Sequence, residues 1–385
     1  MQKMIAALAL TVLSTNSFAA DYLEVIVNPP SVKLDWSTPA QLSRAYLSSA
    51  VKATAAEIVG SARVRSTVGH VMIHFNCVGT NNEAHDFYTG MSGQENQFKS
   101  IHQLLIDQSG LSVLFSPVDD GYIESDDEVR DLIYNHYARK DHKKNSPTIV
   151  KDNKFMRFKV SAEQCDQALE VQKAYAAVSF DEPKEHLSRL PPQDKLYFGF
   201  TLDAYQTYLD QKKDANSPLG GVCSSFAVAI LKAAGVFDPS FDLFWKRSVE
   251  ASIDLIGGVN PQTQQNYRIS LKELLERKNS RWITPGIETK SVSIYEPELM
   301  WNFITGVQAC ESTAGNTQAT TATSLCTPEL MDWMHSQKSA VKASEVSAIT
   351  SETEEKVLIS GPKSPTPQYR VYDKDVTRNL TGIGL

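Results

Sequence analysis

The chain has 385 residues, 42% of them hydrophobic and 22% charged, with a formal net charge of −7. This composition is that of a globular protein, long enough for one large domain with additions or for two domains. The chain is mildly acidic and shows no basic amphipathic helix that would bind nucleic acid. Nucleic acid is therefore not expected as a partner.

The N-terminus has the pattern of a secretory signal peptide over residues 1–19. Lys3 supplies the positive charge, Ile5 to Leu13 form a short apolar run, and Ser17-Phe18-Ala19 has the small-x-small form of a cleavage site. The apolar run is too short to span a bilayer, and no later run reaches about 18 apolar residues, so no transmembrane segment is expected. The sequence predicts an exported protein, periplasmic or secreted, that begins near Ala20.

The chain has five cysteines, and export would let them form disulfides. An odd number leaves at least one thiol unpaired within the chain. Cys310 and Cys326 flank a loop rich in Gly, Thr and Ala, where a bridge would contribute about 3 kcal/mol through loop-closure entropy. A second pair, Cys77 with Cys165, would leave Cys223 as the free thiol.

Strand and helix patterns follow one another along the chain. An apolar alternation in residues 21–40 predicts a strand, and a helical pattern over 39–59 has Pro39 near its start. Two alternating runs around a Val-Gly-Thr-Asn-Asn turn predict a β-hairpin, roughly 68–77 and 84–91. The further predicted elements are a helix near 97–108, a strand at 111–118, a helix after the acidic loop 119–128, a strand at 155–160, a helix with Ser161 as its N-cap, a strand at 195–200, a helix near 270–277, and helical segments at 295–307 and 327–341.

A cysteine begins the most apolar helix pattern of the chain, in "GGVCSSFAVAILKAAG". The helix is expected to begin at Cys223 and to end before Gly235. The first turn of a buried helix presents unpaired N–H groups and a partial positive charge, which favour the reactive thiolate. The amides of Cys223 and Ser224 would hold a developing oxyanion, and Gly221 would let a substrate approach closely. Cys223 is the candidate nucleophile, with a packing cysteine as the alternative.

A thiol nucleophile needs a base, and the predicted hairpin carries three histidines. His70 and His74 share one face of the first strand, and His85 lies on the returning strand. If the turn centres near Gly79–Thr80, His74 and His85 are near-opposite neighbours, although a slip of one residue would change the face. Histidines without a role are one alternative. A zinc site is less favoured because no acidic or cysteine ligand has typical spacing with them, and the acidic loop 119–128 lacks calcium-ligand spacing, so no metal is expected.

These residues carry a resemblance to a known superfamily. "GHVMIHF", a histidine on the next strand, and the much later "GGVCSSFAVAILKAAGV" are similar to the circularly permuted branch of the papain-like, NlpC-type cysteine hydrolases. That branch includes relatives of lecithin retinol acyltransferase, and in it the histidine precedes the cysteine in the chain. By motif, Cys223 matches the nucleophile, His70 after Gly69 matches the base, and His85 is the best match for the orienting third residue. His74 is the alternative base.

The resemblance implies an α+β fold, in which a papain-like core with an antiparallel sheet packs against the nucleophile helix. The core would occupy residues 20–260, with an insertion at about 92–160. An irregular, disulfide-clasped extension would follow over 261–345, and a mobile tail over 346–385.

The implied function is thiol-dependent hydrolysis or acyl transfer at an amide or ester, without a metal or organic cofactor. For an exported protein the first expectation is a cell-wall peptide, since peptidoglycan is the commonest target of the wider superfamily. Because the permuted branch also contains enzymes that act on lipid acyl groups, a lipid acyl hydrolase is an alternative. A non-catalytic exported binding protein on the same scaffold, with Cys223 buried or bridged to Cys77 or Cys165, is the alternative from a different class.

Overall fold

The structure is a computed structural model. It describes residues 21–30, 32–58, 69–92, 121–134, 153–178, 197–198, 202–256, 258–259, 266–267, 274, 281–314, 326–342, 358–359 and 368–372. The signal segment 1–19, the predicted helix near 97–108 and the predicted strand at 111–118 lie outside these residues. Of the helix predicted near 270–277, only Leu274 is described.

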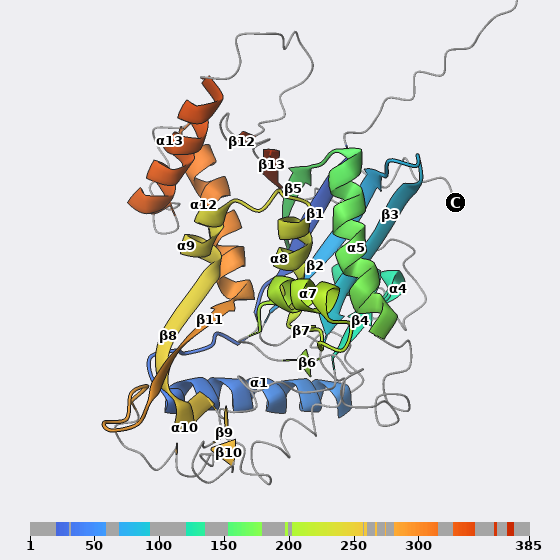
Figure 1. Cartoon of the computed structure of the whole chain (residues 1–385). Helices are drawn as coiled ribbons and strands as arrows, with labels where there is room; N and C mark the ends of the chain where they lie inside the picture. Colours follow the sequence, from blue (N-terminus) through green and yellow to red (C-terminus); the bar gives the residue numbers. More distant parts are fainter. Residues whose placement is uncertain are drawn as a thin grey trace, which may run out of the picture.

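A seven-stranded antiparallel sheet forms the centre of the fold (Figure 1). Its strands lie in the order β12-β13-β5-β1-β2-β3-β4, so segments far apart in the sequence become neighbours. The α+β class predicted from the sequence is therefore confirmed. The strands are β1 (Tyr22–Asn28), β2 (His70–Val78), β3 (Ala84–Ser92), β4 (Tyr122–Glu124), β5 (Lys154–Lys159), β12 (Leu358–Ile359) and β13 (Gln368–Tyr372).

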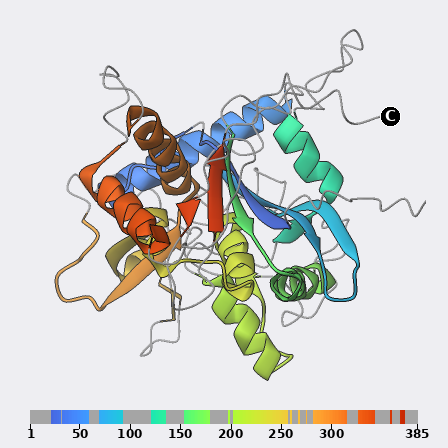
Figure 2. The ribbon, with the colours of Figure 1, turned by 90° about the horizontal axis from the view of Figure 1, so that it is seen from above.

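Helices cover both faces of this sheet. Figure 2 shows α5 and α8 on one side of the strands and α4 on the other. The helices are α1 (Pro39–Ile58), α4 (Asp126–Tyr134), α5 (Ala162–Val178), α7 (Ala204–Lys213), α8 (Cys223–Ala233), α9 (Asp242–Trp245), α10 (Ile253–Ile256), α12 (Pro297–Ala314) and α13 (Pro328–Lys342), with a 3₁₀ turn η5 (Pro239–Phe241) before α9.

Three smaller strand pairs complete the described structure. They are the antiparallel pair β8 (Lys246–Ser252) with β11 (Thr289–Tyr295), the parallel pair β6 (Tyr197–Phe198) with β7 (Gly220–Gly221), and the antiparallel pair β9 (Gly258–Val259) with β10 (Asn266–Tyr267).

The predicted ends of two helices are confirmed by their hydrogen bonds. Ser161 Oγ accepts from the Gln164 amide at 3.3 Å, and Gln164 Oε1 accepts from the Ser161 amide at 2.9 Å, which is a reciprocal cap at the start of α5. Gly235 takes a positive φ of 67° directly after α8 and closes the helix C-terminus.

The largest hydrophobic core lies between the sheet and α8. Strand β2 alternates, so Val71, Ile73 and Phe75 point into this core, where they meet Phe226 and Ile230 of the nearly all-buried α8. Burial of this helix explains why its sequence is apolar on almost every side.

The C-terminal helices share this core rather than forming an extension of their own. Phe303 of α12 and Trp333 of α13 are buried in the same cluster as the sheet residues. Strands β12 and β13, within the segment expected as a mobile tail, extend the sheet beside β5.

The expected insertion at 92–160 also contributes to the sheet. Strand β5 pairs with β1, and β4 pairs with β3, so both belong to the central sheet. Apolar side chains from the segments expected as core, insertion and extension are thus buried in one cluster against this sheet.

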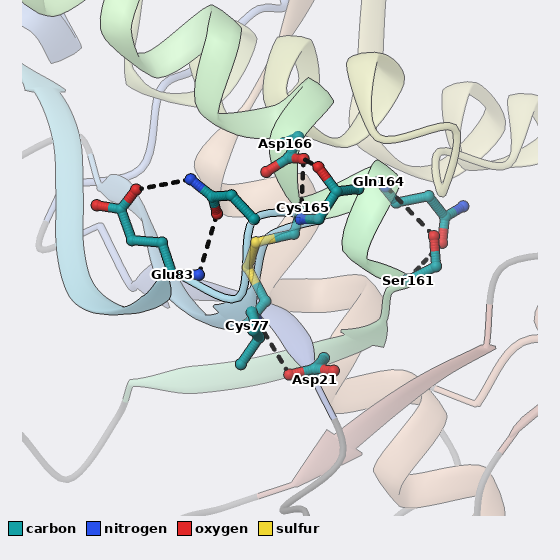
Figure 3. The surroundings of a disulfide bond; sticks show 10 residues. Asp21, Cys77, Glu83, Ser161, Gln164, Cys165 and Asp166 are labelled. Atoms are coloured by element: carbon teal, nitrogen blue, oxygen red, sulfur yellow. Dashed lines mark hydrogen bonds between the residues drawn. A yellow bond between two sulfur atoms is a disulfide. The ribbon is translucent and has the colours of Figure 1, made fainter.

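Two disulfides are present: the predicted bridge between Cys310 and Cys326 is confirmed, and the pair that the sequence offered as a second bridge, Cys77 with Cys165, is also bonded. Cys77 at the end of β2 is bonded to Cys165 near the start of α5, with a sequence separation of 88 (Figure 3). Cys310 in α12 is bonded to Cys326, with a separation of 16, and Cys223 is free. Two disulfides are compatible with an exported protein. No helix in the described part of the chain has the length and hydropathy needed to cross a membrane.

The β2–β3 hairpin forms where it was predicted, but its register differs. His74 lies opposite Tyr88, and His85 lies opposite Cys77. The turn is thus centred at Asn81, close to Asn82 with its positive φ of 61°, and not at Gly79–Thr80. His85 is thus shifted by three positions along β2. Because side chains alternate between the two faces of a sheet, this odd shift also places His85 on the other face.

Candidate functional site

The candidate site begins at one end of the central strands, where β2 starts with His70. His70 Nε2 lies 2.7 Å from Glu124 Oε2, at the end of the short strand β4. Both residues are buried, with exposed fractions of 6% for His70 and 5% for Glu124. A hydrogen bond between a buried imidazole and a buried carboxylate fixes the orientation of the ring.

A glycine on the strand between them makes this contact possible. Gly90 of β3 pairs with Met72 on one side and with Glu124 on the other. Side chains directly opposite one another share a face, so Glu124 extends across the space above Gly90 toward His70. A Cβ atom at position 90 would overlap Glu124 Oε2 and would lie 3.3 Å from His70 Nε2. Glycine is therefore the residue that leaves room for the carboxylate.

Cys223, in the first turn of α8, lies beside His70 and interacts with its ring. Because Nε2 is engaged by Glu124, Nδ1 is the ring nitrogen that remains for the thiol. Cys223 itself is half-buried, the most accessible of the three side chains. His70 thus lies between a thiol and a carboxylate, as the base of a thiol nucleophile would.

Two opposing effects act on the pKa of His70. Burial of the ring alone would lower its pKa, but the Glu124 carboxylate and Cys223 together outweigh burial and raise the pKa of His70 well above its ordinary value. The environment therefore favours the imidazolium form, which is the form that a neighbouring thiolate would stabilise.

The backbone before Cys223 is held in one conformation. Gly221 has a φ of +141°, and a Cβ there would meet Ser225 Oγ at 2.6 Å and Ala204 Cβ at 2.8 Å. The Val222 amide donates to Ser225 Oγ at 2.8 Å, and Val222 offers no side-chain acceptor to the first turn of the helix. Gly221 is thus required for close packing, a reason different from the substrate approach expected from the sequence.

The hydroxyl group of Ser224 is engaged in a hydrogen bond within the fold, so it does not face a substrate. Its Oγ donates to the Tyr295 carbonyl at 2.5 Å and is fully buried, so it ties α8 to the end of β11. What Ser224 can offer to a substrate is its backbone amide, which has no intrahelical acceptor because it lies in the first turn of α8.

His74 lies outside this arrangement, although it shares a face of β2 with His70. Its Nε2 is 2.8 Å from Asp86 Oδ1, its Nδ1 is 3.6 Å from Glu24 Oε2, and its ring stacks on Tyr88 at 4.0 Å. Both nitrogens face carboxylates, so His74 is not placed as the alternative base. Among the described residues, no three His, Cys, Asp or Glu side chains are grouped closely enough to hold a metal ion.

His85 is not the residue that orients His70. It lies opposite Cys77, seven positions along β2 from His70, which corresponds to about 23 Å. His85 interacts electrostatically with Asp166, beside the disulfide at the far end of the hairpin (Figure 3). Glu124 holds the place expected for His85.

Sequence reasoning missed Glu124 for a local reason. Glu124 lies within the acidic loop 119–128, where one more carboxylate gives no signal. The alternation Tyr-Ile-Glu before the helix start at Asp126 was the available sign of a short strand with Glu124 on its buried face.

Comparisons of this chain with protein-family models, with curated proteins and with solved structures give no match.

Proposed function

We propose that this protein is a thiol-dependent hydrolase or acyltransferase acting at an amide or ester carbonyl. The observation that supports the proposal best is the position of His70, which hydrogen-bonds Glu124 and lies beside Cys223. In this reading Cys223 is the nucleophile, His70 the general base and acid, and Glu124 the orienting carboxylate.

The reaction follows from this order of groups. His70 Nδ1 takes the proton of Cys223, and the thiolate forms a C–S bond with the substrate carbonyl, whose electron pair moves onto oxygen. The Cys223 and Ser224 amides at the start of α8 stabilise that oxyanion. The imidazolium then protonates the leaving amine or alcohol as its bond to carbon breaks. Water, or an acceptor hydroxyl or amine, then attacks the thioester by the reverse sequence.

Glu124 contributes by holding the ring and its charge. The 2.7 Å contact to Nε2 keeps the proton on that nitrogen, which leaves Nδ1 as the acceptor for the thiol proton. A buried carboxylate beside the ring also stabilises the imidazolium that forms during the reaction.

The permuted papain-like core is part of the same proposal. It is supported by a cysteine that begins a helix packed on an antiparallel sheet, and by a histidine that begins a strand earlier in the chain. Export is likewise proposed, on the signal pattern of residues 1–19 and the two disulfides. For an exported enzyme of this type the proposed substrate is a cell-wall peptide, with a lipid acyl ester as the alternative.

Mass-spectrometric cysteine mapping tests the nucleophile. The unreduced protein is treated with iodoacetamide between pH 5 and 9, and each cysteine is quantified after digestion. Cys223 should label alone and well below pH 8, and His70→Ala should slow this labelling. A matched control is His85→Ala, which removes a histidine from the same hairpin without touching the site. Inert Cys223, or equal effects of the two histidine variants, would contradict the proposal.

Turnover tests the reaction itself. Purified muropeptides and acyl esters of phospholipids are each incubated with the protein and with Cys223→Ala, and the products are identified by mass. Cleavage of muropeptides that is lost in Cys223→Ala would support the peptide substrate, and cleavage of the esters alone would support the lipid substrate. If neither class is cleaved while Cys223 labels readily, both substrate proposals are wrong.

A further inference from the structure

A further polar residue, Asn153, lies at the same end of the central strands and has no role in the proposed triad. Asn153 lies directly before β5 and is 2% exposed. Neither Oδ1 nor Nδ2 of its carboxamide has a hydrogen-bond partner. A buried amide with all its hydrogen-bonding capacity unmet is unfavourable, and such groups in folded proteins call for an explanation.

The strand register places Asn153 in line with His70. Asn28, the last residue of β1, pairs with His70 at the start of β2. Because β5 begins with Lys154 opposite Val27, Asn153 comes alongside Asn28 where the ladder ends. Asn153, Asn28 and His70 thus form a row across three neighbouring strands.

The three side chains of this row also share a face of the sheet. Two residues further along each strand, Phe155, Ile26 and Met72 form one buried cluster. Since side chains alternate along a strand, Asn153, Asn28 and His70 lie on that same face, and His70 also interacts with Cys223 because it is the first residue of β2, at the end of the sheet. Two strand spacings separate the backbones at positions 153 and 70, which corresponds to about 10 Å.

We propose that the Asn153 carboxamide binds a peptide group of the substrate, which deepens and rests on the function proposed above. A carboxamide offers a donor and an acceptor side by side, and the N–H and C=O of one residue in an extended chain offer the complementary pair. The separation of about 10 Å between the backbones at positions 153 and 70 equals roughly three residues of extended chain, so the bound residue lies a few positions from the part of the substrate beside His70.

This contact selects peptides over lipid acyl esters. An acyl chain has no donor or acceptor at that distance from its ester, so it would leave the carboxamide unpaired. A site built to hydrogen-bond its substrate rejects analogues that lack the matching groups, because its own buried polar atoms then stay unsatisfied.

The test compares two electrophiles that differ only in peptide groups. An acetyl-tripeptidyl chloromethyl ketone and an alkyl chloromethyl ketone of equal length both alkylate Cys223, as its sulfur displaces chloride. In Asn153→Leu, labelling of Cys223 by the peptidyl reagent should slow about 10-fold or more, while the alkyl reagent and iodoacetamide label as in the parent protein. Asn153→Asp, which keeps the shape but loses the donor, should also slow the peptidyl reagent. The control is Asn76→Leu, at the other end of β2.

Urea unfolding without any reagent separates binding from a structural role. Because Asn153 has no partner in the free protein, the unfolding midpoint of Asn153→Leu should equal or exceed that of the parent. A clearly lowered midpoint, or equal effects on the two chloromethyl ketones, would overturn the inference while activated labelling of Cys223 by iodoacetamide still supported the triad. If iodoacetamide shows Cys223 to be inert, the proposed function fails and this inference fails with it.

Discussion

The replacement Glu124→Gln tests the least expected member of the site. Gln has the shape of Glu, so the strand pairing and the space above Gly90 are kept while the negative charge is removed. Glu124 helps to raise the pKa of His70, so its neutralisation lowers that pKa and reduces the imidazolium population near neutral pH. The variant should therefore keep the fold with a lower free energy of unfolding, and it should react slowly.

The size of the effect follows from the burial of the pair. His70 and Glu124 are 6% and 5% exposed and 2.7 Å apart, so solvent screens their interaction little. Removing one partner of a buried ion pair costs about 3–5 kcal/mol. If that energy is lost from the imidazolium state of the reaction, the rate falls by about 10²- to 10³-fold or more, at about 1.4 kcal/mol per factor of ten.

Two rates measure this effect. One is labelling of Cys223 by iodoacetamide across pH 5–9, and the other is turnover of whichever substrate class is found. Glu128→Gln is the matched control, since Glu128 lies in the same acidic segment but binds Ser125 at the start of α4. Parent-like labelling and turnover in Glu124→Gln, with an unchanged pH profile, would refute the role assigned to Glu124.

The remaining predictions concern space, pH and covalent structure. Gly90→Ala should displace the Glu124 carboxylate and reproduce the labelling profile of Glu124→Gln; a parent-like profile would show that the carboxylate has room to move. The pKa of His70 is raised in the native state. Its contribution to the free energy of unfolding is therefore full at pH 6 and is lost as the pH rises through the native pKa. The gap in urea unfolding free energy between the parent and His70→Gln should shrink from pH 6 to pH 10, and a constant gap would contradict the assignment. The Cys310→Ser variant, which cannot bond Cys326, should unfold about 3 kcal/mol more easily, and an unchanged unfolding free energy would exclude stabilisation by that bridge.

Local patterns were sufficient to predict many individual elements. The helix that begins at Cys223, the cap at Ser161 and the two disulfides all depend on residues that are close in sequence or limited in number. Such features need only short-range geometry or a small set of pairings, so the sequence constrains them well.

Register and sheet order were not predictable in the same way. The hairpin required a choice between turns centred at Gly79–Thr80 and at Asn81, and the sequence Val-Gly-Thr-Asn-Asn accommodates both. Because side chains alternate along a strand, that choice decided which face His85 occupies. The position of the turn therefore decides where His85 lies, whereas its assignment as the orienting residue came from the resemblance of the motif.

The strands that complete the site come from one long covalent loop. The bond between Cys77 and Cys165 closes a segment of 88 residues that contains Gly90, Glu124 and Asn153. Cross-linking a loop of this length restricts the unfolded chain and contributes roughly 4.5 kcal/mol in the chain-entropy model. Since His70 precedes this loop and Cys223 follows it, the bridge fixes the relation of β2, which carries the base, to α5, which packs beside the nucleophile helix. The placement of Gly90 and Glu124 next to His70 thus depends on the long-range pairing of the sheet, to which this bridge contributes.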